Sequence, residues 1–186
     1  MYRICTTEDA ATRQRQLEAQ LRREMGSRRL EQITASELCA PLGISRRAFY
    51  HYFSGKEDAL TALLDHTLQE YAVFECPQDP GRPTHFSELK RFVVFWQQQK
   101  ELLDALHHNH LEHKLAERTL ALLATEGSAL RCSLRLTDTE YREQLRRVIV
   151  DGVYSVIFGW YKAGFRQAPD QVTELLCHIL LEPLVV

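Results

Sequence analysis

Long apolar runs, glycine and proline are all scarce in this chain of 186 residues, which contains eight glycines and six prolines. No apolar run approaches the roughly 20 residues that a membrane-spanning helix needs, and the N-terminus lacks the apolar segment of a signal peptide. Strand-like alternation is hard to find, whereas the helix formers Leu, Glu, Gln, Arg and Ala dominate. We therefore expect an all-α, cytoplasmic protein without a membrane span.

Cysteine pairs and catalytic motifs are also absent. The five cysteines are odd in number, widely spaced and never arranged as C-x-x-C. This pattern argues against a disulfide framework or a zinc ribbon and favours a reducing compartment. No nucleophile–base pair, phosphate-binding loop or paired-carboxylate motif is recognisable. We therefore expect neither an enzyme nor a bound cofactor.

Charge is distributed unevenly along the chain. The formal net charge of −2 at pH 7 alone argues against a nucleic-acid-binding protein. Residues 1–56, however, hold ten Lys or Arg against six Asp or Glu, whereas the remainder holds thirteen against nineteen. Because the local field matters more than the total charge for binding a polyanion, the basic N-terminal part is the candidate for contacting nucleic acid.

The stretch from Ile33 to Asp58 contains two short helical segments joined by a tight turn. Thr34 is a suitable N-cap for the first segment, and Glu37 follows it at the spacing of a capping box. Gly43 can turn sharply without a Cβ clash, and Ser45 is a suitable N-cap for the second segment. Two short helices joined by a glycine-containing turn form a helix-turn-helix, which binds DNA through its second helix.

The second segment has two different faces. Ala48, Phe49 and Tyr52 lie at a spacing that faces the core. The opposite face carries two cations and two groups that donate hydrogen bonds, namely Arg46, Arg47, Tyr50 and His51. Arginine can bind guanine or phosphate through two hydrogen bonds, and Tyr and His can bind phosphate oxygens. This face therefore suits the major groove of DNA.

The pattern I-T-x-S-E-L-x-x-x-x-G-I-S-R-x-x-F-Y-x-Y-F-x-x-K-E-D-x-L, which begins at Ile33, resembles the DNA-binding domain of the TetR family of transcriptional regulators. The resemblance covers about the first seventy residues. Arg47-Ala48 stands where the family usually has Gly-Thr, so a hydroxyl contact is lost and a cation is gained. The resemblance implies a helix-turn-helix DNA-binding domain over residues 1–55 and a ligand-binding and dimerisation domain over residues 56–186.

The resemblance also implies roles for individual residues. Thr34, Ser36 and Ser45 would lie where the two short helices meet the DNA backbone, and Arg46 and Arg47 would contact bases. Flanking phosphates would be held by Tyr50, His51, Tyr52 and Lys56. Four further arginines could contact phosphate or merely increase solubility: Arg22, Arg23, Arg28 and Arg29.

Helical periodicity continues through the rest of the chain. We expect about nine helices, near residues 7–25, 34–42, 45–52, 56–74, 84–96, 101–108, 111–125, 138–163 and 169–180. The last two have wide apolar faces and match the dimerisation helices of the family. The resemblance further implies an effector pocket, and its candidate lining is apolar and mostly aromatic: Phe92, Phe95, Trp96, Leu103, Leu106, Tyr154, Phe158 and Tyr161.

A histidine cluster suggests an alternative. His107, His108, His110 and His113 lie close together in the sequence, and a spacing of three places two imidazoles on one helix face. Zinc or copper would need two or three more ligands nearby, and none is identifiable, so a solvated helix junction is the simpler interpretation.

The preferred hypothesis is a homodimeric regulator, in particular a repressor that a small molecule releases from a palindromic DNA operator. Other interpretations stay open. The regulator could lack a small-molecule ligand, or it could respond to metal through the histidine cluster. From a different class, the chain could be a helical interaction module or a hydrolase with a vestigial DNA-binding motif.

Overall fold

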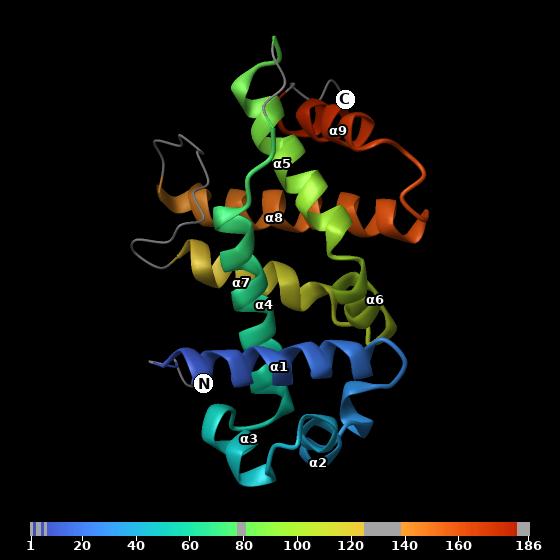
Figure 1. The fold of residues 1–186 in the computed structure, drawn as a ribbon. Coiled ribbons are helices and arrows are strands. Elements are labelled where there is room, and N and C mark those ends of the chain that lie inside the picture. Colours follow the sequence, from blue (N-terminus) through green and yellow to red (C-terminus); the bar gives the residue numbers. More distant parts are fainter. Residues whose placement is uncertain (1, 3–4, 6, 78–80, 125–138, 182–186) are drawn as a thin grey trace. The chain divides into compact units, whose positions relative to one another are not determined.

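The computed structural model describes residues 2, 5, 7–77, 81–124 and 139–181. Within these ranges the chain forms nine α-helices and no strand (Figure 1). The helices are α1 (Glu8–Met25), α2 (Ala35–Cys39), α3 (Arg46–Tyr52), α4 (Lys56–Val73), α5 (Thr84–Gln98), α6 (Lys100–His108), α7 (Glu112–Leu123), α8 (Thr139–Lys162) and α9 (Pro169–Leu181). Two 3₁₀-helices, η1 (Leu30–Gln32) and η2 (Ala40–Leu42), flank α2. No described helix combines the length and apolarity that crossing a membrane requires.

The all-α fold expected from the sequence is confirmed, with one difference at the first short helix. The predicted helix over residues 34–42 ends early, because α2 stops at Cys39 and the chain tightens into η2. Pro41 gives the physical reason, since proline in a helix interior clashes with the carbonyl four residues before it. The predicted start of a helix near residue 138 lies outside the described residues.

The chain packs as two compact units. The first unit comprises residues 1–67 and 101–112, and the second comprises residues 68–100 and 113–186. The division between them falls inside α4, so it differs from the boundary between residues 55 and 56 that the resemblance implies. The functional roles assigned to residues 1–55 and 56–186 stay predictions, because packing units do not reveal function.

The first unit contains the helix-turn-helix and holds it on α1. Leu17, Leu21 and Met25 form a stripe along α1 in which each side chain is 0% exposed. The carboxylate of Glu18 is buried on the same helix and lies 2.8 Å from Nδ1 of His66 on α4. Helix α1 packs against α2, and the contact between Glu18 and His66 joins α1 to α4.

The second unit has an aromatic core around α5. Tyr71 of α4 contacts Phe92 and Phe95, and Tyr154 of α8 contacts Phe92 and Trp96, with ring centroids 5.3 to 5.8 Å apart. Helix α5 also packs against α9. Two ion pairs join the same region, Lys90–Asp170 at 2.8 Å and Arg82–Glu174 at 3.0 Å.

Gly43 forms the turn between η2 and α3 in a left-handed conformation, with φ of 62°. Its amide donates to the carbonyl of Ala40 at 3.2 Å, and the next amide, of Ile44, donates to the carbonyl of Cys39 at 3.1 Å. A Cβ at Gly43 would meet no heavy atom within 4 Å. The requirement for glycine therefore comes from the backbone angle and not from crowding.

We expect Gly43→Ala to lower the free energy of unfolding by about 1–2 kcal/mol, because a Cβ is strained in the left-handed region. Gly43→Asn should cost less, since asparagine tolerates this conformation better. Thermal unfolding followed by circular dichroism tests both variants. Equal losses for Ala and Asn would contradict the assignment to backbone strain.

Candidate nucleic-acid interface

The first short helix is closed at its N-terminus by a complete capping box. Thr34 Oγ1 accepts from the amide of Glu37 at 3.3 Å, while Glu37 Oε2 accepts from the amide and the hydroxyl of Thr34, each at 2.8 Å. Hydrogen bonds from the Thr34 hydroxyl and amide, with a further contribution from Arg28, lower the pKa of the Glu37 carboxyl. A lowered pKa keeps the cap ionised at neutral pH, and its stabilisation is lost as pH falls through that pKa.

Helix α3 presents a polar face to solvent and buries the opposite one. Phe49 is 1% exposed and Tyr52 is 7% exposed, whereas Tyr50 is 54% exposed. Ser45 caps the helix, its Oγ accepting from the amide of Ala48 at 3.2 Å. An open depression of about 520 Å³ lies on this surface and is lined by Ser45, Arg47, Ala48, Tyr50 and His51. Arg46 is also exposed. The predicted separation into two faces is observed for Phe49 and Tyr52, which are buried. The prediction was wrong for Ala48, which is half-buried and lines the exposed depression.

Three residues predicted to bind the DNA backbone have other partners in this structure. The ammonium of Lys56 donates to the carbonyls of Glu31 at 2.7 Å and Ile33 at 3.2 Å. The Thr34 hydroxyl forms the capping box, and the ring of Tyr52 is buried. Ser36 is exposed on α2. Phosphate contacts by these residues stay predictions. For Thr34 and Lys56, the intramolecular hydrogen bonds observed here would compete with any hydrogen bond to a phosphate.

Three of the four arginines near the end of α1 have protein partners. Arg22 lies 3.4 Å from Glu101, and Arg28 lies 3.0 Å from Glu37. Arg29 donates to the carbonyl of His108. Arg23 is exposed. An intramolecular role therefore accounts for Arg22, Arg28 and Arg29 without a phosphate.

The histidine run includes a residue that sequence reasoning missed. Asn109 is 9% exposed, and its side-chain amide bonds four backbone groups around it. The only signal in the sequence is an amide residue placed between histidines, which does not identify its partners.

The histidines themselves have diverse surroundings. His107 Nδ1 lies 2.7 Å from Glu112, and His110 Nε2 lies 3.2 Å from Arg29. His108 and His113 are exposed. Among the residues that the structure describes, no group of three or more His, Cys, Asp or Glu side chains is placed to hold a metal ion. An arginine beside His110 is also unfavourable for binding a cation there.

The residues predicted to line an effector pocket are divided between the two units. Phe92, Phe95, Trp96 and Tyr154 meet in the aromatic core of the second unit, and Phe158 contacts Tyr161 with ring centroids 6.3 Å apart. The other two candidates belong to α6 in the first unit, namely Leu103 and Leu106.

Two polar groups lie within this aromatic core. The indole Nε1 of Trp96 is buried and has no acceptor among the described residues. The hydroxyl of Tyr154 lies 2.8 Å from that of Thr119, and burial raises the pKa of Tyr154 well above its usual range. The core therefore contains one donor without a partner and one neutral hydroxyl pair.

Helices α8 and α9 leave an apolar surface exposed. Val148 is 66% exposed, Leu175 is 49% exposed and Ile179 is 43% exposed. A depression of about 290 Å³ between these helices is lined by Val156, Gly159, Trp160, Ala163, Gln167, Gln171, Val172 and Leu175. A Cβ added at Gly159 would meet no heavy atom within 4 Å. Another apolar surface can therefore approach this face closely.

Comparison with known proteins covers both the helix-turn-helix and the whole fold. Residues 20–63, from the second half of α1 into α4, match the model described as "Bacterial regulatory proteins, tetR family". A tetR-family transcriptional regulator from Streptomyces coelicolor is similar with a TM-score of 0.53 and 20% identity, over 91% of this chain and 78% of that chain. The fatty acid degradation regulator FadR from Bacillus halodurans is similar with a TM-score of 0.58 and 16% identity, over 93% of this chain and 96% of that chain. No curated protein matches the sequence significantly. At these identities the solved structures establish a common fold.

We expect Lys56→Met to lower the free energy of unfolding by about 1 kcal/mol, because two carbonyls lose a charge-assisted hydrogen bond. Lys162→Met, which removes an exposed lysine at the end of α8, is the control and should change stability little. Chemical denaturation measures both. An unchanged stability for Lys56→Met, together with weaker DNA binding at low salt, would instead identify Lys56 as a phosphate contact.

Proposed function

We propose that this chain, whose residues 20–63 match the model of the TetR family of bacterial regulatory proteins, is a repressor that binds a palindromic DNA operator as a homodimer and is released by a small molecule. The main support for this proposal is the exposed polar face of α3. It offers Arg46, Arg47, Tyr50 and His51 to solvent on a helix that is fixed from behind by buried Phe49.

The chemistry of that face suits base and phosphate recognition. An arginine guanidinium can donate two parallel hydrogen bonds to O6 and N7 of guanine, the commonest specific contact in the major groove. Tyr50 and His51 lie one turn further along α3, where their polar groups can bind phosphates on either side of the groove. The excess of cations over residues 1–56 favours this encounter electrostatically.

A homodimer is supported by the apolar face of α8 and α9. Large side chains such as Val148, Leu175 and Ile179 are exposed there, and exposed apolar patches are a feature of protein–protein interfaces. A recognition helix of seven residues contacts few bases by itself. Pairing two subunits about a two-fold axis would place two such helices on half-sites one DNA turn apart, or a multiple of it.

An apolar effector is supported by the composition of the second unit. Among the described residues of that unit no charged side chain is buried, and the core around Trp96 is aromatic. The free indole N–H of Trp96 could bond an acceptor on such a molecule, since a buried unsatisfied donor costs about 1–3 kcal/mol. Release from DNA requires that the molecule bind the DNA-free conformation more tightly than the DNA-bound one.

We expect in vitro selection from a random duplex pool at moderate salt to recover a palindrome. Arg46→Ala or Arg47→Ala should then weaken binding to the selected operator more than binding to unrelated duplex, by about 1–3 kcal/mol where the side chain contacts a base. Tyr50→Phe should weaken both alike. Fluorescence anisotropy titrations measure these affinities. Equal losses on both duplexes for each arginine would show that the two cations only neutralise phosphate.

We expect Leu175→Glu to convert the dimer to a monomer, because each subunit would bury a carboxylate in an apolar interface. Val73→Glu, at an apolar residue of α4 that is 79% exposed, is the matched control and should leave the dimer intact. Light scattering coupled to gel filtration gives the mass of each variant. A dimeric Leu175→Glu protein would contradict the assignment of this face.

A further inference from the structure

The amide of Asn109 joins the end of α6 to the turn that follows α1. Its Nδ2 donates to the carbonyl of Met25 at 2.8 Å, of Ala105 at 2.8 Å and of Arg28 at 3.3 Å. Its Oδ1 accepts from the amide of Leu30 at 2.6 Å. A buried polar side chain satisfied in this way is costly to displace, because each abandoned group must find another partner.

Two further contacts attach α6 to α1 and its turn. Near the start of α6, Glu101 lies 3.4 Å from Arg22 of α1. At its other end, Arg29 donates to the carbonyl of His108, the last residue of α6, and lies 3.2 Å from Nε2 of His110. Helix α6 is therefore held at both ends.

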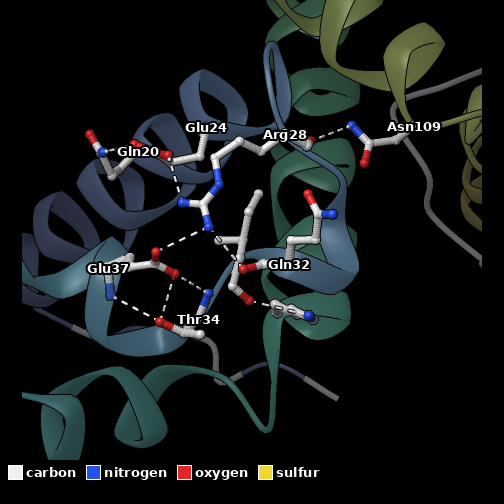
Figure 2. Close-up of polar contacts among 9 residues, drawn as sticks. Gln20, Glu24, Arg28, Gln32, Thr34, Glu37 and Asn109 are labelled. Atoms are coloured by element: carbon white, nitrogen blue, oxygen red, sulfur yellow. Dashed lines mark hydrogen bonds and ion pairs between the residues drawn. The ribbon is translucent and has the colours of Figure 1, made fainter.

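The same turn is linked to the helix-turn-helix by the side chain of Arg28 (Figure 2). Its guanidinium lies 3.0 Å from Glu37 and 3.4 Å from Glu24, and it donates to the carbonyl of Gln32 at 3.0 Å. Glu37 in turn closes the capping box on Thr34. A continuous polar chain thus runs from Asn109, through the backbone and side chain of Arg28, to the first residues of α2.

The position of α6 in the chain makes this link informative. Residues 101–112 pack in the first unit, yet the segments directly before and after them, residues 68–100 and 113–186, form the second unit. The segment that contains α6 is therefore joined covalently to the second unit on both sides, while Glu101, His108 and Asn109 contact α1 or the turn after it.

We propose that Arg28 and Asn109 are positioning residues for DNA binding, which couple the docking of α6 to the capped N-terminus of α2 and hence to α3. This inference rests on the proposed DNA-binding function. Neither residue contacts DNA in this mechanism. Because coupling is reciprocal, DNA that selects the capped arrangement of α2 also favours docked α6, and undocking of α6 lowers affinity for the operator.

The first test compares Arg28→Met and Glu37→Gln with Arg13→Met, which removes the charge of an exposed arginine elsewhere on α1. The first two variants break the same ion pair from opposite sides and should each weaken operator binding about tenfold, a coupling of typical size. Combining them should weaken binding by less than the sum of the two single effects, since the Arg28–Glu37 ion pair is lost only once. Arg13→Met should have a much smaller effect.

Salt dependence separates positioning from direct contact. Losing a phosphate contact reduces the slope of log affinity against log salt by about one, whereas a positioning residue leaves the slope at the parent value. We expect Arg28→Met to bind more weakly with an unchanged slope. A reduced slope would overturn the proposal by making Arg28 a phosphate ligand.

Hydrogen exchange tests the coupling in the free protein. The amide of Leu30, which donates to Asn109, should exchange faster in Glu37→Gln, although Glu37 does not contact either residue. Conversely, Asn109→Ala should speed exchange at the amide of Thr34. Because Asn109→Ala leaves the Leu30 amide unsatisfied and threatens the fold, Glu37→Gln is the decisive variant. Unchanged exchange at Leu30 in that variant would overturn the coupling.

The outcomes also separate this inference from the proposed function. If the parent protein binds no duplex at any salt concentration, DNA binding is refuted and the positioning role falls with it. If the parent binds its operator but Arg28→Met and Glu37→Gln bind it equally well, the positioning role alone is refuted.

Discussion

The burial of Phe49 is the interaction on which the proposed DNA-binding surface depends. Helix α3 has seven residues, and a helix of that length is not stable by itself in water. The unfavourable free energy of helix nucleation exceeds the stabilisation from its few internal hydrogen bonds. Phe49 is 1% exposed and fixes the helix from behind, while the Ser45 cap satisfies its first turn. The exposed arginines of α3 therefore depend on the burial of Phe49 for their position.

Much of this arrangement could be predicted from the sequence, because local rules determine it. The capping box of Thr34 and Glu37, the left-handed turn at Gly43 and the two faces of α3 follow from residue type and spacing over a few positions. Contacts between distant segments could not be predicted in this way. The amide of Leu30 meets Asn109 across 79 positions in the sequence, and nothing local to either residue specifies the other.

Periodicity was also insufficient for the second unit. It places Phe92, Trp96, Leu103 and Leu106 on inward faces of α5 and α6, and all four face inward as apolar residues at helical spacing should. It does not tell which unit buries them, and the leucines pack with the first unit while the aromatic residues pack with the second. Which of the two cores buries a residue depends on the path of the whole chain, and periodicity within a window of about eighteen residues does not contain that information.

The separation of α6 from its neighbours in the chain has a consequence for recombining such proteins. A fragment cut inside α4, after residue 67, would contain the whole helix-turn-helix but would lack the segment 101–112 that completes its unit. The carbonyl of Met25 and the amide of Leu30 would lose the side chain that bonds both. A chimera should therefore take both segments of the first unit, residues 1–67 and 101–112, from the same parent, because this unit is discontinuous in sequence.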